Sequence, residues 1–428
     1  MRPLALLLLL FAVPSRAQTV VPLGEALALA ETHSLAVLRA DADVAASSAA
    51  VRAVDDGRWP SLGLYLGGGQ RYGLAFDQTS GALTQETVES VSLGVSAGYV
   101  VFDGFERRAE RRAAEVGLRE AELDRARVQQ QAHAAILDGY LAVAQAEAAR
   151  EVAEESVDAE TEWLREINVR VEYGDRPPSE VAQQRERIAA ARGAVVGAER
   201  DRALAHARLV RLLGLDPAGA YAFPTPPPAP SEDLVSADDL VARALGNRRD
   251  LKAAGLAIQA TEANKRAARA SRLPQVSLGG FVGTSYTSAA GVGFPGQIGD
   301  NRTGSLSLNV SLPILDRGVT RGRIRQAEAR EQALRAAEAD TRRAIALEVQ
   351  EHRIRLDALA AQSEIAEIRV EAAQTALDAE RARYVAGETT LQSVSILQAR
   401  LHEARTNQAL LRVQAQFERR LLMLALGE

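Results

Sequence analysis

The side chains that most often carry out chemistry in proteins are few in this chain, and they are scattered along it. Cysteine is absent, which excludes a disulfide framework, a thiolate zinc site and a thiol nucleophile. None of the five histidines lies four residues from another, and no His-Glu-x-x-His motif occurs. We therefore predict no enzyme, no bound metal and five histidines on helix surfaces, namely His33, His133, His206, His352 and His402.

Two glycine-rich stretches resemble phosphate-binding loops in spacing only. Gly291–Gly296, with the sequence GVGFPG, has the spacing of a dinucleotide-binding loop. Such a loop holds phosphate at the N-terminus of the helix that follows it. This stretch contains a proline, lies between two predicted strands and is expected to open no helix, so we interpret it as a surface loop. The stretch GGGQRYG, residues 67–73, fails for the same reason, and no cofactor is predicted.

The charge balance gives no indication of nucleic acid binding. The formal net charge is -5, from 51 Lys and Arg against 56 Asp and Glu. Basic runs such as FERRAERRAAE, residues 105–115, contain matching acids and are typical of a solvated helix face.

The N-terminus has the pattern of a signal peptide. Arg2 precedes the apolar run Leu4–Val13, and Ser15-Arg16-Ala17 is a small-x-small cleavage pattern, so we predict cleavage after Ala17. The alternative is an anchor helix, but the run is much shorter than the roughly 20 residues that span a bilayer. No cysteine follows, so no lipid anchor is expected.

The sequence is duplicated. RVEYGDRPPSEVAQQRERIAAAR, residues 170–192, matches RYVAGETTLQSVSILQARLHEAR, residues 383–405, at an offset of 213. Chance similarity of Ala-rich helices does not explain matched turn residues in the same order. The matched pairs are Asp103 with Asp316, Gly174 with Gly387, Asp175 with Glu388 and, at an offset of 214, Pro60 with Pro274. We predict a first repeat at 18–215, a Pro-rich linker at 216–235 and a second repeat at 236–428.

Each repeat is predicted to contain a helix, two strands, a long helix, a turn and a return helix. Proline-free Ala, Arg and Glu-rich segments predict the long helices, and Trp59-Pro60 ends the first helix. A loop of about a dozen residues is expected between the first two strands. In the first repeat the entry helix is expected at about 23–58 and the long helix at about 105–170, and the return helix after the turn at 174–178 is expected to end at about 213. The strands are expected at about 61–73 and 89–103. In the second repeat the strands are expected at about 275–286 and 304–316, and the long helices at about 320–384 and 390–425.

The strands alternate between apolar residues on one face and Ser, Gly or Asn on the other. The alternation is expected to reach Val101 in the second strand and Ile314 in the fourth. A sheet packed on a helix is the alternative, but the adjoining helices are polar and very long. We therefore interpret the strands as a membrane wall with its apolar face toward lipid. The predicted lipid-facing residues are Leu62, Leu64, Val91, Leu93, Val95, Val276, Leu278, Leu306, Leu308 and Val310.

Four strands cannot close a barrel, and an open edge in lipid leaves backbone groups unsatisfied. Two copies of the chain would supply eight strands, and three would supply twelve, which is wide enough for a lumen. Trp59, Tyr99 and Phe102 lie at the strand ends nearest the helices. We interpret them as an interfacial aromatic belt, with ordinary packing as the alternative.

The two matched segments around Gly174 and Gly387 resemble the outer-membrane factor family, the TolC-like outer-membrane efflux proteins. The resemblance implies a mainly α fold with a small membrane β part, and a homotrimer that shares a 12-stranded barrel continued by a helical periplasmic tunnel. It implies the exit duct of a tripartite efflux pump or type I secretion system, opened by a periplasmic adaptor and an inner-membrane pump. The alternative is a soluble periplasmic coiled-coil adaptor or scaffold.

The same resemblance implies roles for the helical turns. Gly174, Asp175, Gly387 and Glu388 would form the periplasmic tip where the adaptor docks, and Glu180 and Tyr384 would constrict the pore. Some members of the family carry two aspartates, one turn apart, that ring the closed tip. The matching positions here are Ser393 and Ile396, so an acidic ring is not expected. The remaining acidic candidates are Asp175, Glu180 and Glu388.

Overall fold

The structure is a computed structural model that describes residues 19–77, 81–227, 236–290 and 292–427. The predicted signal peptide and its cleavage site lie outside the described residues. The chain forms two compact units, and each unit combines segments from both halves of the sequence. We call the described residues within 42–123 and 251–340 the sheet unit, and the described residues within 1–41, 124–250 and 341–428 the hairpin unit.

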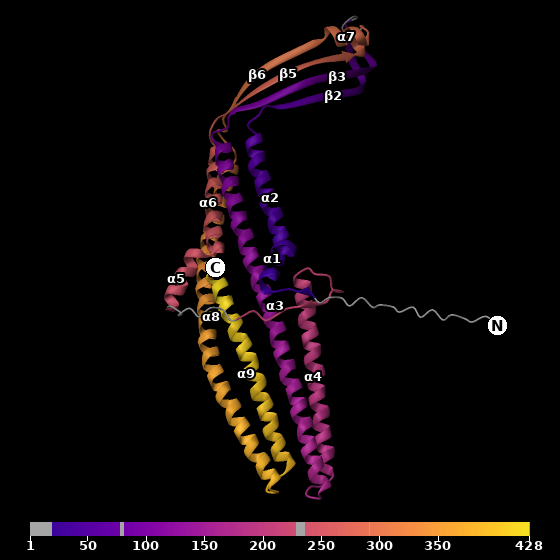
Figure 1. Ribbon diagram of the computed structural model, residues 1–428. Coiled ribbons are helices and arrows are strands. Elements are labelled where there is room, and N and C mark those ends of the chain that lie inside the picture. Colours follow the sequence, from indigo (N-terminus) through magenta and orange to yellow (C-terminus); the bar gives the residue numbers. More distant parts are fainter. Residues whose placement is uncertain (1–18, 78–80, 228–235, 291, 428) are drawn as a thin grey trace, which may run out of the picture. The chain divides into compact units, whose positions relative to one another are not determined.

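Helices make up most of the described chain, as the sequence predicts (Figure 1). The helices are α1 Leu23–His33, α2 Leu35–Asp56, α3 Glu106–Glu172, α4 Ser179–Leu212, α5 Ala237–Asn247, α6 Arg249–Ala270, α7 Phe294–Asp300, α8 Val319–Val385 and α9 Leu391–Ala425. The strands are β1 Thr19–Val20, β2 Ser61–Asp77, β3 Ala82–Phe102, β4 Tyr221–Ala222, β5 Gln275–Thr287 and β6 Arg302–Ser311.

The first helix is not continuous, contrary to the expectation for about 23–58. Ser34 adopts an extended conformation (φ -66°, ψ 122°) and separates α1 from α2. Arg248 has nearly the same conformation (φ -56°, ψ 124°) between α5 and α6. The break at Ser34 has no proline or glycine beside it, whereas Gly246 and Asn247 immediately precede the break at Arg248.

The hairpin unit is closed around an apolar core that the sequence analysis did not describe. Ala26 and Ala30 of α1 are buried there beside Tyr140, whose hydroxyl donates a hydrogen bond of 2.6 Å to the carbonyl of Val21. The short strand β4, within the predicted linker, pairs in parallel with β1. The linker is therefore partly held against the N-terminal end of the described chain.

The sheet unit contains one antiparallel sheet in the order β2-β3-β5-β6 (Figure 1). The hairpin between β2 and β3 is tighter than predicted, because Phe76 and Leu83 still pair across it. The prediction of a loop of about a dozen residues was therefore wrong. Residues 84–87 are all polar, so the alternation of apolar and polar residues did not predict a strand there. They form one nevertheless, because the hydrogen bonds between strands are made by the backbone.

One strand boundary and one strand register also differ from the prediction. Strand β6 ends at Ser311, so Leu312 and Ile314 lie beyond it. Pro313 has no backbone N–H to donate to a neighbouring strand. In β3 the register shifts between Val100 and Phe102. Phe102 is thereby placed opposite Val276, on the face that the alternation had assigned to Val101.

The stretch GVGFPG does open a helix, contrary to our expectation. Helix α7 begins at Phe294, has Pro295 in its first turn and ends after seven residues. Its Gln297 side chain is buried and bonds to the backbone of Thr287, at the end of β5. Helix α7 therefore closes the end of the sheet distant from α2 and α6 (Figure 1).

Aspartates cap both junctions at which a strand passes into a long helix. Asp103 accepts from the backbone N–H of Arg107 at 3.3 Å and from its Nε at 2.6 Å. Asp316 accepts from the N–H of Thr320 at 2.8 Å, and bonds from Thr320 and Gly318 lower the pKa of Asp316 to about 2. Burial works to raise the pKa of Asp103, but the bonds and charge of Arg107 outweigh it and the pKa is lowered.

The Asp103 cap yields the first prediction. Replacing Asp103 with Ala removes the acceptor at the start of α3 and should cost about 1 kcal/mol of unfolding free energy, whereas Asp103→Asn, which keeps an oxygen, should cost less. Because folding lowers the pKa of Asp103, its contribution is present at neutral pH and is lost as the pH falls below about 4. Chemical denaturation followed by circular dichroism at pH 7 and pH 3 measures this. Equal stability of all three proteins at pH 7 would contradict the capping role.

Candidate functional site

Two helical hairpins in the hairpin unit end in turns of the same construction. The α3–α4 turn has Gly174 at φ 77°, and the α8–α9 turn has Gly387 at φ 80°. In each turn the residue after the glycine donates back into the helix, Asp175 to Arg170 and Glu388 to Arg383, both at 2.9 Å. This is a Schellman-type ending, in which a left-handed glycine terminates the helix. Both turns therefore require glycine.

Arginines from the first hairpin donate hydrogen bonds to backbone carbonyl groups at the α8–α9 turn of the second hairpin. The guanidinium of Arg176 donates to the carbonyl of Tyr384 and, at 3.4 Å, to that of Thr389. Arg170 donates to the carbonyl of Val385 at 3.3 Å. The last carbonyls of a helix lack partners within the helix and carry partial negative charge, so cationic donors suit them well. The two turns are thus bonded to each other.

Tyr384 is the centre of this contact. Its side chain is fully buried, and its hydroxyl donates a hydrogen bond to the carboxylate of Glu180 in the first turn of α4. The guanidinium of Arg176 lies over the tyrosine ring, 4.1 Å from the centroid. Burial, followed by the bond to Glu180, raises the pKa of Tyr384 well above its usual value, so the hydroxyl remains a donor at neutral pH.

Trp163 extends the cluster along α3. Its ring lies 5.4 Å from that of Tyr384, and the guanidinium of Arg381 lies 5.0 Å from its centroid. The apolar residues around it belong to all four helices or their ends and include Ile167, Leu377, Leu391 and Val394. We call Arg170, Arg176, Glu180, Trp163 and Tyr384 the turn cluster.

The predicted site residues divide into those that meet and those that do not. Glu180 and Tyr384 are brought together, as described. Asp175 and Glu388 are exposed, and Glu388 lies 3.9 Å from Arg383. The backbone N–H of Ser393 bonds to the Thr390 cap, and Ile396 is half exposed.

Sequence reasoning missed Arg170, Arg176 and Trp163. A usable signal existed for Arg176, because its counterpart at the offset of 213 is Thr389 and the two halves differ there in charge. No such signal marked Trp163, whose partner Tyr384 lies more than 200 residues away in the sequence.

The sheet is the second functional feature, and its register sorts the strand residues onto two faces. Directly paired residues share a face, and Leu64, Val95 and Val282 form one apolar row, as do Leu278 and Leu308. These side chains are exposed: Leu64 at 76% and Leu308 at 65%. A contiguous exposed apolar surface of this kind marks a site of contact with a membrane or with another protein.

The opposite face is built mostly from small residues, and it carries two aromatic side chains that we did not predict. Ser96 pairs with Gly63, and Ser307 with Gly279. Phe281 lies against Gly94 and Gly283, where an added Cβ would come within 2.6 Å of its ring. Tyr65 covers Gly67 in the same manner. Glycine at these positions therefore makes room for the two rings.

Neither metal chemistry nor a membrane-spanning helix is found in the described residues. No group of three or more His, Asp or Glu side chains in this part of the chain could hold a metal ion. Across the same residues, no helix combines the length and the apolar character needed to cross a bilayer.

Comparison with known proteins gives a consistent result. The sequence model of the outer membrane efflux protein family matches residues 26–215 and 240–428. The pyoverdine export outer membrane protein OpmQ of Pseudomonas aeruginosa is 27% identical over 356 residues, which is 81% of this chain and 72% of the relative. Protein CyaE of Bordetella pertussis is 29% identical over 309 residues, covering 71% and 62%.

Solved structures share the fold. The outer membrane protein VceC of Vibrio cholerae aligns with a TM-score of 0.78 at 22% identity, covering 95% of this chain and 96% of VceC. The open state of the MtrE outer membrane channel of Neisseria gonorrhoeae aligns with a TM-score of 0.75 at 19% identity, covering 95% and 88%.

The turn cluster yields the second prediction. Tyr384→Phe and Glu180→Gln should each speed hydrogen–deuterium exchange of the amides of residues 385–390, because each weakens a buried hydrogen bond worth about 1–3 kcal/mol. The double variant should lose less stability than the sum of the losses in the two single variants, with a coupling free energy of about 0.5–3 kcal/mol. Tyr173→Phe, at an exposed tyrosine beside the other turn, is the matched control. Strict additivity would show that the bond contributes nothing.

Proposed function

The chain belongs to the outer membrane efflux protein family, and from this premise we propose that it forms a homotrimeric exit duct through the bacterial outer membrane. The observation that carries the proposal is the one-sided sheet, whose apolar face is exposed in the single chain while its other face is small and polar. Lipid would cover the apolar face, and water would fill the space behind the other.

The edges of the sheet support the trimer. Strands β2 and β6 are at the edges, and neither has a further neighbour among the described residues. In lipid each unpaired backbone group costs several kcal/mol, so the edges must pair with those of other copies. Three copies give twelve strands with an open lumen, whereas two would give eight and a lumen filled by side chains.

The duct would be passive, with energy supplied by an inner-membrane pump acting through a periplasmic adaptor. The name of the Pseudomonas relative connects it with export of pyoverdine, which suggests a duct for exported molecules here as well. We assign adaptor docking to the turns at Gly174, Asp175, Gly387 and Glu388. The left-handed glycines fix the shape of these turns, and the neighbouring acids are exposed to a partner.

The turn cluster would hold the periplasmic end closed. It binds two hairpins of one chain to each other through Arg176, Tyr384 and Glu180. We place the constriction here, with Ser393 and Ile396 lining it on the adjacent turns of α9. Docking of an adaptor would open the duct by separating the hairpins. The alternative of a soluble adaptor finds no support in the family match.

The face assignment yields the third prediction. Val95→Arg places a charge on the lipid face at a cost of roughly 2–4 kcal/mol near the bilayer centre, and should reduce the amount of trimer in the outer membrane fraction. Ser96→Arg, one residue along the same strand, should insert at close to the normal level. Membrane fractionation and trimer mass in mild detergent measure both. Equal tolerance at the two positions, or a detergent-free soluble monomer of the unmodified chain, would overturn the proposal.

The closure assignment yields the fourth prediction. Arg176→Gln combined with Tyr384→Phe removes the guanidinium of Arg176 and the hydroxyl of Tyr384 from the contact between the hairpins. The variant should raise the mean conductance of the full-length trimer in planar bilayers several-fold. Tyr173→Phe should leave it unchanged. Trimer formation by the double variant with unchanged conductance would place the constriction elsewhere.

A further inference from the structure

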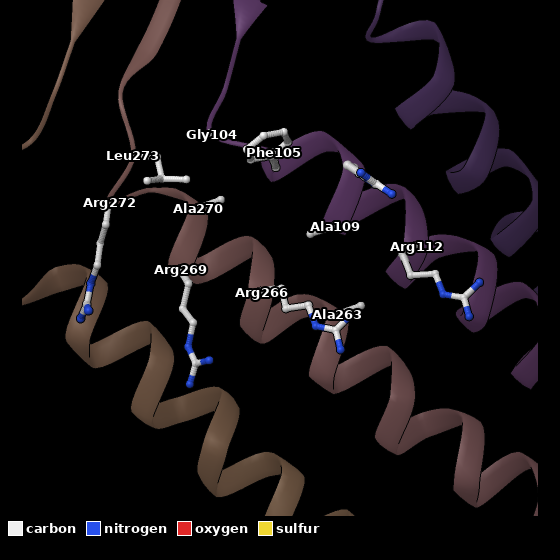
Figure 2. Close-up of a pocket in the computed structure, with 11 residues that line it drawn as sticks. Gly104, Phe105, Ala109, Arg112, Ala263, Arg266, Arg269, Ala270, Arg272 and Leu273 are labelled. Carbon is white, nitrogen blue, oxygen red and sulfur yellow. The ribbon is translucent and has the colours of Figure 1, made fainter.

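The sheet unit contains an arginine-lined pocket of about 760 Å³ between the start of α3 and the end of α6 (Figure 2). Two of its arginines come from α3 and three from α6 or the residue pair that follows it. They are Arg108, Arg112, Arg266, Arg269 and Arg272. None of the eleven described residues that line the pocket is acidic.

The excess of positive charge distinguishes this pocket from the neighbouring surface. Nearby cations are paired: Arg107 lies 2.6 Å from Asp103, and Arg111 lies 3.0 Å from Asp55. In the pocket, Arg112 and Arg269 have acids only at 3.9 and 3.6 Å. The other three arginines of the pocket form no ion pair with a described residue. They are Arg108, Arg266 and Arg272.

The mouth of the pocket is apolar and continues the apolar face of the sheet. Phe105 and Leu273 line it beside Gly104, as Figure 2 shows. The ring of Phe105 is 59% exposed and stands edge-on to that of Phe102 at 5.3 Å. Phe102 in turn pairs with Val276, which belongs to the apolar face. Cationic and apolar surfaces are therefore contiguous.

The backbone fixes this arrangement. Gly104 approaches the end of α6 so closely that an added Cβ would lie 2.7 Å from the carbonyl oxygen of Ala270 and from Cβ of Leu273. Ala109 and Ala263 leave open space between the two helices (Figure 2). The helix ends are thus held together while the space below them stays open.

We propose that this pocket binds the phosphate headgroup of an anionic phospholipid from the periplasmic leaflet, with the acyl chains passing over Phe105 and Leu273 onto the apolar face of the sheet. The inference rests on the proposed function, which places that face in lipid. Guanidinium groups bind phosphate oxygens through paired hydrogen bonds. Basic pockets beside membrane-embedded surfaces bind acidic headgroups for the same reason. The apolar mouth favours a lipid over a free anion.

Native mass spectrometry of the detergent-solubilised full-length trimer, titrated with phosphatidylglycerol, tests the proposal. We expect up to one retained lipid per chain, weaker retention at high salt, and much weaker retention of phosphatidylcholine. Arg108→Gln with Arg266→Gln should weaken phosphatidylglycerol binding by roughly 30-fold. The matched control is Arg325→Gln with Arg330→Gln, which removes two exposed arginines of α8 outside the pocket.

Each outcome decides the matter. Loss of binding in the pocket variant alone supports the site. Equal loss in the control, or inorganic phosphate that competes as well as the lipid does, would overturn it in favour of general charge or a free-anion site. Membrane fractionation and trimer mass of each variant are measured in parallel. A pocket variant that inserts and trimerises normally but retains no phosphatidylglycerol would support the lipid site independently of the proposed function. Failure of the unmodified chain to insert would contradict the proposed function.

Discussion

An antiparallel sheet with two open edges and one exposed apolar face is the constraint on which the other features depend. The sheet cannot be satisfied within one chain, because β2 and β6 have no outer neighbour among the described residues and no described helix shields residues such as Leu64 and Leu308. Water would leave the apolar face exposed, and lipid would leave the edges unpaired. Pairing between copies with lipid outside, as proposed above, would satisfy both.

That constraint explains the construction of the junctions between strands and helices. In the proposed trimer the strands would have to leave the sheet in fixed directions. Both exits toward a long helix carry an aspartate cap near a left-handed glycine, Gly104 or Gly318. The small face of the sheet fits the same proposal, since glycine and serine there would keep the interior of a barrel open. Phe281 and Tyr65 are accommodated there only because glycines lie beneath them.

The sequence predicted the features that have a strong periodic signal or a matched motif. Period-two alternation located the strands and sorted Leu64, Val95 and Leu308 onto one face, and the resemblance to the outer-membrane factor family is confirmed by the family match. Local backbone events escaped prediction: the break at Ser34, the shifted register before Phe102 and helix α7 depend on packing or pairing that no single residue announces. Of the turn cluster, only Glu180 and Tyr384 were named from the sequence, and their contact was not predicted, because it joins segments over 200 residues apart.

The two halves of the chain differ at the residues that make this contact. At the offset of 213, Arg176 corresponds to Thr389, Glu180 to Ser393 and Tyr384 to Val171. Each half thus retains one side of the contact and lacks the other, so two identical hairpins could not make it. In the proposed trimer, a ring of six alternating hairpins, this contact would occur only where a first hairpin meets a second through these residues, and other contacts would hold the remaining boundaries. The difference between the two halves makes the contact specific to unlike hairpins, and in the proposed trimer it would give the ring two kinds of boundary that a docking partner could separate at different cost.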